Sequence, residues 1–229
     1  MIEPPAGVAP RPDSFAARLR GFGPVGILAM FVVVFVGNGA VPLGALLVLG
    51  WAYITGTPWR ALGFTRPRSR VLTVLGGILL GGGFKVAAKA LVMPLFHADP
   101  VNHAYHYLAG NTAALPGAIW TMIVAAGFGE ETVYRGYLFE RFGRLFRARA
   151  GARAATVLIV TTVFAAGHYL DQGIPGVEQA FVTGLLFGVL RASGVGLPFL
   201  MVTHAAFDLT AVAMIYADLE SKFAHLVFR

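Results

Sequence analysis

The chain has 229 residues, of which 57% are hydrophobic and only 13% are charged. Soluble domains carry about 25% charged residues, so this composition argues against a water-soluble protein and favours a single multi-span membrane domain. The net charge is +7 and there is no cysteine, which excludes disulfides and thiol catalysis. The arginines gather in short connections between apolar runs, a pattern typical of membrane topology and anionic lipid rather than of nucleic-acid binding.

The N-terminal segment, residues 1–20, is rich in Pro and Arg and lacks the apolar core of a cleaved signal peptide. The next stretch, 21–59, contains no charged residue. It is too long for one helix across a core of about 30 Å, and Gly37-Asn38-Gly39 with Pro42 offers a break. Two short spans are therefore predicted here, with the basic segments on both sides of them in the cytoplasm.

Five further apolar runs follow along the chain. They are Val71–Phe96, Ala118–Phe139, Ala154–Leu170, Val177–Leu190 and Gly196–Tyr216. Their connections alternate between strongly basic and free of Lys and Arg, as the positive-inside bias predicts for seven spans with a cytoplasmic N-terminus. The sequence thus predicts an all-α, polytopic helical bundle over 21–217, a tail at 218–229, and a prokaryotic cell membrane as its location.

Two adjacent glutamates, Glu130 and Glu131, lie inside the run Ala118–Phe139. An ionised carboxylate at the centre of a spanning helix costs about 2.5–3.5 kcal/mol, so such residues indicate a functional site. Glu131 and Arg135 are spaced i and i+4, which favours an ion pair along one helix. Glu130 is then free to face a cavity, where desolvation suits a carboxylate to act as a general base.

Two other spans also carry unusual polar residues. His168 ends one run, and His204 and Asp208 share one helical face of another. Taking 1.5 Å per helical residue, Glu130, His168 and the His204–Asp208 pair all lie roughly 12–20 Å from the cytoplasmic ends of their helices. This common depth predicts that three spans build one site.

The chemistry of that site has two interpretations at this stage. Glu130, His168, His204 and Asp208 are ligand types that hold a first-row metal such as zinc together with a water molecule. The same residues also suit direct activation of water by Glu130 and His168. The ligand set alone does not separate the two.

Three motifs occur in order along the chain: E-E-x-x-x-R at 130–135, F-x-x-x-H at 164–168 and H-x-x-x-D at 204–208. Together they resemble the CPBP family of intramembrane endopeptidases, which includes the type II CAAX prenyl proteases and the bacteriocin-processing and immunity proteins. The segment Trp59–Phe64 is similar to a W-x-x-L-G-L-type segment of that family. The family-like core is expected at about 116–212.

The resemblance implies hydrolysis of a peptide bond of a membrane-associated protein or peptide, inside or at the edge of the bilayer. It implies that Glu130 and His168 activate the attacking water, and that Glu131 and Arg135 shape the site. His204 and residue 208 would stabilise the oxyanion, and accounts of the family differ on whether a metal takes part.

The chain departs from the family pattern at Asp208, where many members carry Asn. An amide donates a hydrogen bond to an oxyanion, whereas an ionised carboxylate repels it. Asp208 is therefore expected to be protonated, to bind a metal, or to act through His204.

Other polar residues receive simpler interpretations. Lys85 and Lys89 are expected to snorkel, to line the cavity or to meet a substrate carboxylate. The histidines at 97, 103 and 106 are predicted to lie in a wet outer loop, and the arginines at 141, 144, 147, 149 and 153 to set topology.

Two other function classes stay open. The first is a non-catalytic member of the same family, an immunity factor or membrane scaffold. The second is a transporter or proton pathway, because carboxylates and histidines at the midplane also serve translocation.

Overall fold

The computed structural model describes residues 14–39, 42–147 and 149–228, and within these ranges the chain is helical without any strand. Four helical segments are long and apolar enough to cross a membrane: Arg70–Leu95, Thr112–Phe146, Tyr169–Ala192 and Leu197–Tyr216. Three shorter apolar helices accompany them: Pro24–Val36, Leu43–Thr55 and Ala152–Gly167. The predicted all-α polytopic membrane fold is confirmed, and these segments correspond to the seven predicted apolar runs.

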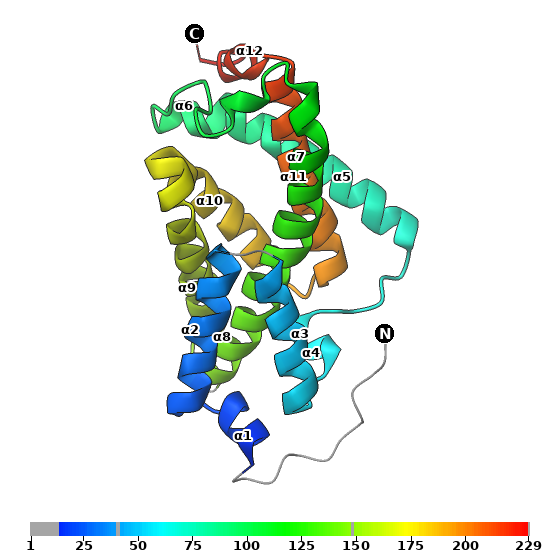
Figure 1. The fold of residues 1–229 in the computed structure, drawn as a ribbon, viewed down its shortest axis with the longest axis vertical. Coiled ribbons are helices and arrows are strands. Elements are labelled where there is room, and N and C mark those ends of the chain that lie inside the picture. The colour runs from blue at the N-terminus through cyan, green and yellow to red at the C-terminus, as the bar shows by residue number, and fades with distance from the viewer. Residues whose placement is uncertain (1–13, 40–41, 148, 229) are drawn as a thin grey trace.

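The helices follow one another with short connections (Figure 1). In the first half they are α1 (Phe15–Arg20), α2 (Pro24–Gly39), α3 (Leu43–Thr55), α4 (Trp59–Leu62), α5 (Arg70–Ala87), η1 (Ala88–Val92), α6 (Met93–Leu95), η2 (His106–Leu108) and η3 (Thr112–Ala114). In the second half they are α7 (Leu115–Trp120), η4 (Thr121–Glu130), η5 (Thr132–Leu138), α8 (Phe139–Phe146), α9 (Ala152–Gly167), α10 (Tyr169–Ala192), α11 (Leu197–Tyr216) and α12 (Glu220–Ala224). Residues 1–13 of the predicted N-terminal segment lie outside the described ranges, as does Arg229 of the tail.

The helix that carries the two glutamates is continuous from α7 to α8 but is π-helical over η4 and η5. A π-helix closes each turn with an i→i+5 bond, and such turns often occur at functional sites. The predicted run, 118–139, is therefore the middle of a longer helix, and an α-helix was the wrong geometry to assume there. The i, i+4 pairing of Glu131 with Arg135 survives, at 2.9 Å.

The connection predicted at 171–176 is shorter than expected, because only Gly173 has non-helical backbone angles and two helical pieces, labelled together as α10, meet there at a kink. Gly173 has φ 63° and ψ −157°, a conformation that glycine adopts without strain, and Pro175 follows it. Together they kink the helix and do not end it. α9 ends at Gly167. His168, which was predicted to lie inside the span, is therefore the residue between α9 and α10.

Arg141 was predicted only to set topology, but it also has a structural role. Its side chain is buried and donates hydrogen bonds to the carbonyls of Arg20 and Gly21. It also lies over the ring of Phe22, 4.3 Å from the centroid. Arg141 therefore joins α8 to the end of α1.

The predicted tail, 218–229, contains the short helix α12, which lies at the end of the bundle opposite α1 (Figure 1). Glu220 at its start is buried and forms an ion pair with Lys89 at 3.1 Å. Its carboxylate also accepts from the backbone N–H of Asn102. Lys89 therefore does not snorkel or face the cavity of the site; it joins η1 to the tail and to the loop before η2.

α5 packs closely against α11 through glycines on one face. Gly77 and Gly81 are buried and one turn apart. A Cβ on Gly77 would lie 2.8 Å from Cγ1 of Val202, and one on Gly81 would collide with the backbone carbonyl of Thr203. Small residues at this spacing let two membrane helices approach at backbone distance.

Replacing Gly81 with Ala is expected to push α5 away from α11 and to destabilise the protein by about 1–3 kcal/mol, the range for overpacking a tight site. The matched control is Gly83→Ala on the same helix, where a Cβ meets nothing within 4 Å. The measurement is thermal unfolding in detergent. Equal melting temperatures for the two variants would contradict the packing described here.

Candidate active site

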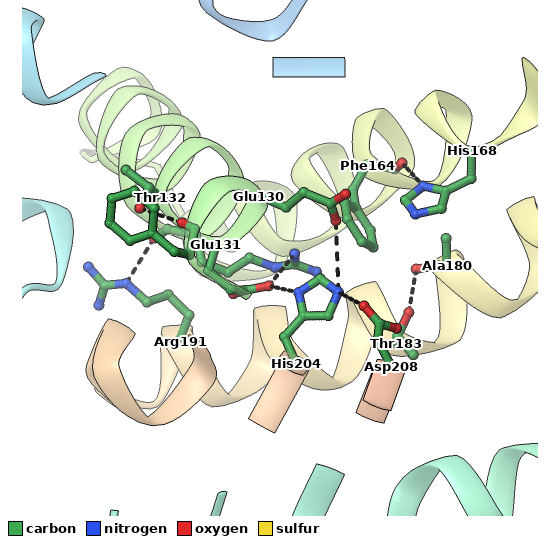
Figure 2. Close-up of polar contacts among 12 residues, drawn as sticks. Glu130, Glu131, Thr132, Phe164, His168, Ala180, Thr183, Arg191, His204 and Asp208 are labelled. Carbon is green, nitrogen blue, oxygen red and sulfur yellow. Dashed lines mark hydrogen bonds and ion pairs between the residues drawn. The ribbon is translucent and has the colours of Figure 1, made fainter. Parts of the chain in front are cut away.

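A cavity of about 300 Å³ lies between α5, the π-helical segment η4, α10 and α11. Glu130, His168 and Asp208 all line it. Residues from three separate helical segments thus reach one space. Figure 2 shows their side chains around the imidazole of His204.

Glu131 is the centre of a buried polar chain. Its Oε1 accepts from Nη1 of Arg135 at 2.9 Å and from Nδ1 of His204 at 2.8 Å. All three side chains are buried, and Glu131 and Arg135 have no exposed surface. The ion pair with Arg135 was predicted, whereas the hydrogen bond to His204 was not. Glu131 therefore fixes the orientation of the His204 ring.

Arg135 is also held by aromatic rings. Its guanidinium carbon lies 4.3 Å from the ring centroid of Phe164 and 5.4 Å from that of Phe187. A guanidinium over an aromatic face is stabilised by the ring quadrupole. The phenylalanine of the F-x-x-x-H motif thus supports the arginine of the first motif, and the two motifs form one packed unit.

The Glu130 side chain lines the cavity and approaches the His204 ring at a different nitrogen from Glu131 (Figure 2). Its Oε2 is 3.8 Å from Nε2 of His204. That oxygen is buried and has no hydrogen-bond partner among the described residues. It is therefore free to accept a hydrogen bond from a group bound in the cavity.

His168 presents one nitrogen to that cavity. Its Nδ1 donates to the backbone carbonyl of Phe164 at 2.9 Å, since a carbonyl oxygen only accepts. This bond occupies Nδ1 and leaves Nε2 available to another partner. His168 can consequently accept a proton or a hydrogen bond at Nε2.

Asp208 and His204 lie side by side, with Oδ2 of Asp208 3.4 Å from Nε2 of His204. Nε2 of His204 is therefore flanked by two carboxylates, Asp208 and Glu130, while Nδ1 is held by Glu131. This surrounding favours the charged imidazolium. Of the three expectations for Asp208, the geometry favours action through His204.

Comparison with known proteins agrees with this geometry. Residues 112–210, somewhat less than half of the chain, match the family model described as type II CAAX prenyl endopeptidase Rce1-like. The match supports the CPBP/CAAX protease family for this part of the chain, as the resemblance of the three motifs predicted. The description of the family model is that of an endopeptidase. Comparisons with curated proteins and with solved structures found no match.

The Trp59–Phe64 segment lies outside the matched residues but contacts this protease core. Gly63 ends α4 at φ 94°, and its carbonyl accepts from the N–H of Leu197 at the start of α11. Arg191 donates from Nε to the carbonyl of Arg135 at 3.0 Å and from Nη2 to that of Ala61 at 3.4 Å. The segment therefore braces the helices that carry Arg135 and His204, and it does not reach the cavity.

The predicted metal ligands can be tested against the arrangement of the protease core. Within the described residues, no three His, Cys, Asp or Glu side chains are placed to hold one metal ion. Nδ1 of His204 donates to Glu131 and Nδ1 of His168 donates to a carbonyl, which leaves only Nε2 of each ring as a possible ligand. As arranged, Glu130, His168, His204 and Asp208 do not fit a zinc centre, so no step below passes through a metal.

A second cavity, of about 430 Å³, adjoins the first. Four residues line both of them: Asn102, Asp171, Gln172 and Gln179. The second cavity is bounded by the loop at 99–104, in which His103 pairs with Asp99 at 3.0 Å, and by the kink of α10. The two cavities thus form a path from the outer loop to Glu130.

Two residues that line the first cavity were not singled out from the sequence, namely Tyr105 and Gln179. Burial, followed by the nearby charge of Asp208, raises the pKa of Tyr105 to about 12. Its phenol is therefore a neutral hydrogen-bond donor at any working pH. Neither residue belongs to a motif, and only the fold of the outer loop and of α10 brings them to the site.

Proposed function

We propose that this protein is an intramembrane endopeptidase that hydrolyses a peptide bond of a membrane-associated protein or peptide. The observation that carries the proposal is the Glu130 carboxylate, whose buried Oε2 has no hydrogen-bond partner among the described residues and which lines a cavity shared with His168 and Asp208. The family match over 112–210 supports the same class of reaction.

In the first step Glu130, as general base, removes a proton from water, while Nε2 of His168 holds the water by accepting its other hydrogen. The oxygen attacks the scissile carbonyl carbon and forms the new C–O bond. General-base catalysis of this kind contributes about 10²–10⁴ in rate.

In the second step the developing oxyanion is stabilised by the His204 imidazolium, which Glu131 and Asp208 hold in its charged form. The C–N bond then breaks, and Glu130 returns its proton to the leaving amine. Asp208 thus contributes through the charge on His204 and does not contact the oxyanion, which explains how a carboxylate can occupy this position.

The orientation that accompanies this proposal has the N-terminus in the cytoplasm of a prokaryotic cell. The site lies on helices long and apolar enough to cross a membrane, so the substrates would be membrane-embedded or membrane-bound peptides, with lipid as the surrounding partner.

The test is hydrolysis by purified protein in proteoliposomes that contain membrane-anchored peptides, with fragments identified by mass spectrometry. The wild type is expected to produce defined new termini, and a variant changed at Glu130, His168 and His204 together is expected to produce none. A cellular phenotype that persists in this triple variant would favour a scaffold or immunity factor. Substrate-dependent flux without cleavage would favour a transporter.

The same assay tests metal dependence. Because no three of the described His, Asp or Glu side chains are placed to hold one metal ion, hydrolysis is expected to persist in excess chelator, and metal analysis is expected to find well below one zinc per chain. Inactivation by chelator that added zinc reverses, with one zinc bound per chain, would instead establish the metal interpretation. The control is a known zinc peptidase treated in parallel.

A further inference from the structure

Lys85 is an ammonium group in an unusual place. It lies on the same face of α5 as Gly77 and Gly81, each one turn from the next, and is only 5% exposed. The close approach of α5 to α11 at the two glycines continues to Lys85, which therefore reaches Phe207 and the cavity. A lysine this deep in a membrane helix is costly and marks a functional contact.

The contacts of Lys85 with the described residues include no ion pair. Its Nζ donates to Oε1 of Gln179 at 2.7 Å and lies 4.8 Å from the ring centroid of Phe207. Two other buried bases of the core differ, since Lys89 pairs with Glu220 and Arg135 with Glu131. No carboxylate among the described residues forms such a pair with Lys85. An ammonium has three donors, and the neutral amide of Gln179 takes one.

Gln179 shows where the remaining donors can act. It lines both cavities, while Lys85, Glu130 and Asp208 line the inner one. Lys85 and Gln179 therefore lie where the path from the outer loop enters the space in front of Glu130. A chain bound along that path passes Lys85 close to the bond to be cleaved.

We propose that Lys85, oriented by Gln179, binds a carboxylate of the substrate and so selects peptides that carry one within a few residues of the scissile bond. This inference rests on the proposed peptidase function and adds the substrate class. The carboxylate is either the C-terminal carboxyl or an Asp or Glu side chain, since both present the same acceptor pair.

The other charged groups around the cavity are compatible with an anion at Lys85. Glu130 and Asp208 face His204, at 3.8 and 3.4 Å from its Nε2. Asp171 lines both cavities but is exposed, so that water screens its charge. A charge-assisted hydrogen bond to a buried ammonium is about twice as strong as a neutral one.

The test uses binding, which needs no turnover, so that it can succeed or fail independently of hydrolysis. Three dansyl-labelled peptides of alternating Leu and Ala are titrated into detergent-solubilised protein: one with a free C-terminal carboxyl, one with a C-terminal amide, and one with the amide and an internal Glu. Fluorescence anisotropy reports binding, and mass spectrometry checks that the peptides stay intact. The wild type is expected to bind at least one carboxylate peptide roughly tenfold or more tightly than the neutral amide.

Lys85→Met is expected to bring that ratio close to one. Lys85→Gln removes the charge but keeps a polar group beside Gln179. If the methionine variant does not fold, the same ratio of affinities is measured on this variant. The matched control is Lys222→Met, which removes an exposed charge on α12 and is expected to keep the wild-type ratio. The carboxylate peptide whose tighter binding is lost in the Lys85 variants shows whether the C-terminal carboxyl or a Glu side chain is recognised. A wild type without preference, or a preference that survives both changes at Lys85, would overturn the proposal even if the protein cleaves peptides.

Discussion

Glu130→Gln is expected to lower the rate of peptide hydrolysis by about 10²–10⁴-fold, the usual contribution of a general base, and to leave the fold intact. Gln has the same shape as Glu but cannot take a proton from water. The Glu130 side chain is 20% exposed to the cavity, and its Oε2 makes no hydrogen bond within the described chain. Its neutralisation therefore breaks little that holds the helices together.

The measurement is single-turnover hydrolysis in proteoliposomes, with thermal unfolding of the same preparation as the check on folding. Glu178→Gln is the matched control, because it makes the same chemical change on a spanning helix, α10, at a position that lines neither cavity. It should retain the wild-type rate. A Glu130→Gln variant that hydrolyses peptide at the wild-type rate would remove Glu130 as the base and, with it, the proposed mechanism.

Much of the arrangement around Glu130 follows from local rules that a sequence displays. The i, i+4 spacing pairs Glu131 with Arg135, and this pairing turns Glu130 toward the cavity. The common depth of the polar residues in their spans predicts that they meet, because helices in a bilayer share one set of planes. Hydropathy gives the seven apolar segments, since a span must satisfy its backbone internally.

Contacts between distant segments could not be predicted in this way. Glu131 and His204 are 73 positions apart, and the hydrogen bond between them depends on how two helices rotate against each other. Lys89 and Glu220 meet for the same reason, and neither residue carries a local signal for the other. The kink of α10 at Gly173 was predicted as a loop because Gly and Pro mark both kinks and turns.

The second large effect is expected at Glu131, where a substitution should first of all lower the stability of the folded protein. Glu131→Gln should destabilise the protein by about 3–5 kcal/mol, the range for removing one partner of a buried ion pair. The guanidinium of Arg135 has no exposed surface, and its ion pair among the described residues is with Glu131. The substitution leaves that charge in the core and also deprives Nδ1 of His204 of its carboxylate acceptor.

The decisive measurement compares thermal unfolding in detergent of the Glu131→Gln and Glu130→Gln proteins, which differ only in which neighbouring carboxylate is neutralised. A much lower melting temperature is expected for Glu131→Gln alone. The double variant Glu131→Leu with Arg135→Met should recover part of the loss, because an apolar pair often replaces a buried ion pair without penalty. It should nevertheless stay slow in hydrolysis, since His204 is no longer oriented. If the two single variants unfold at the same temperature, the division of these glutamates into a base and a structural support is wrong.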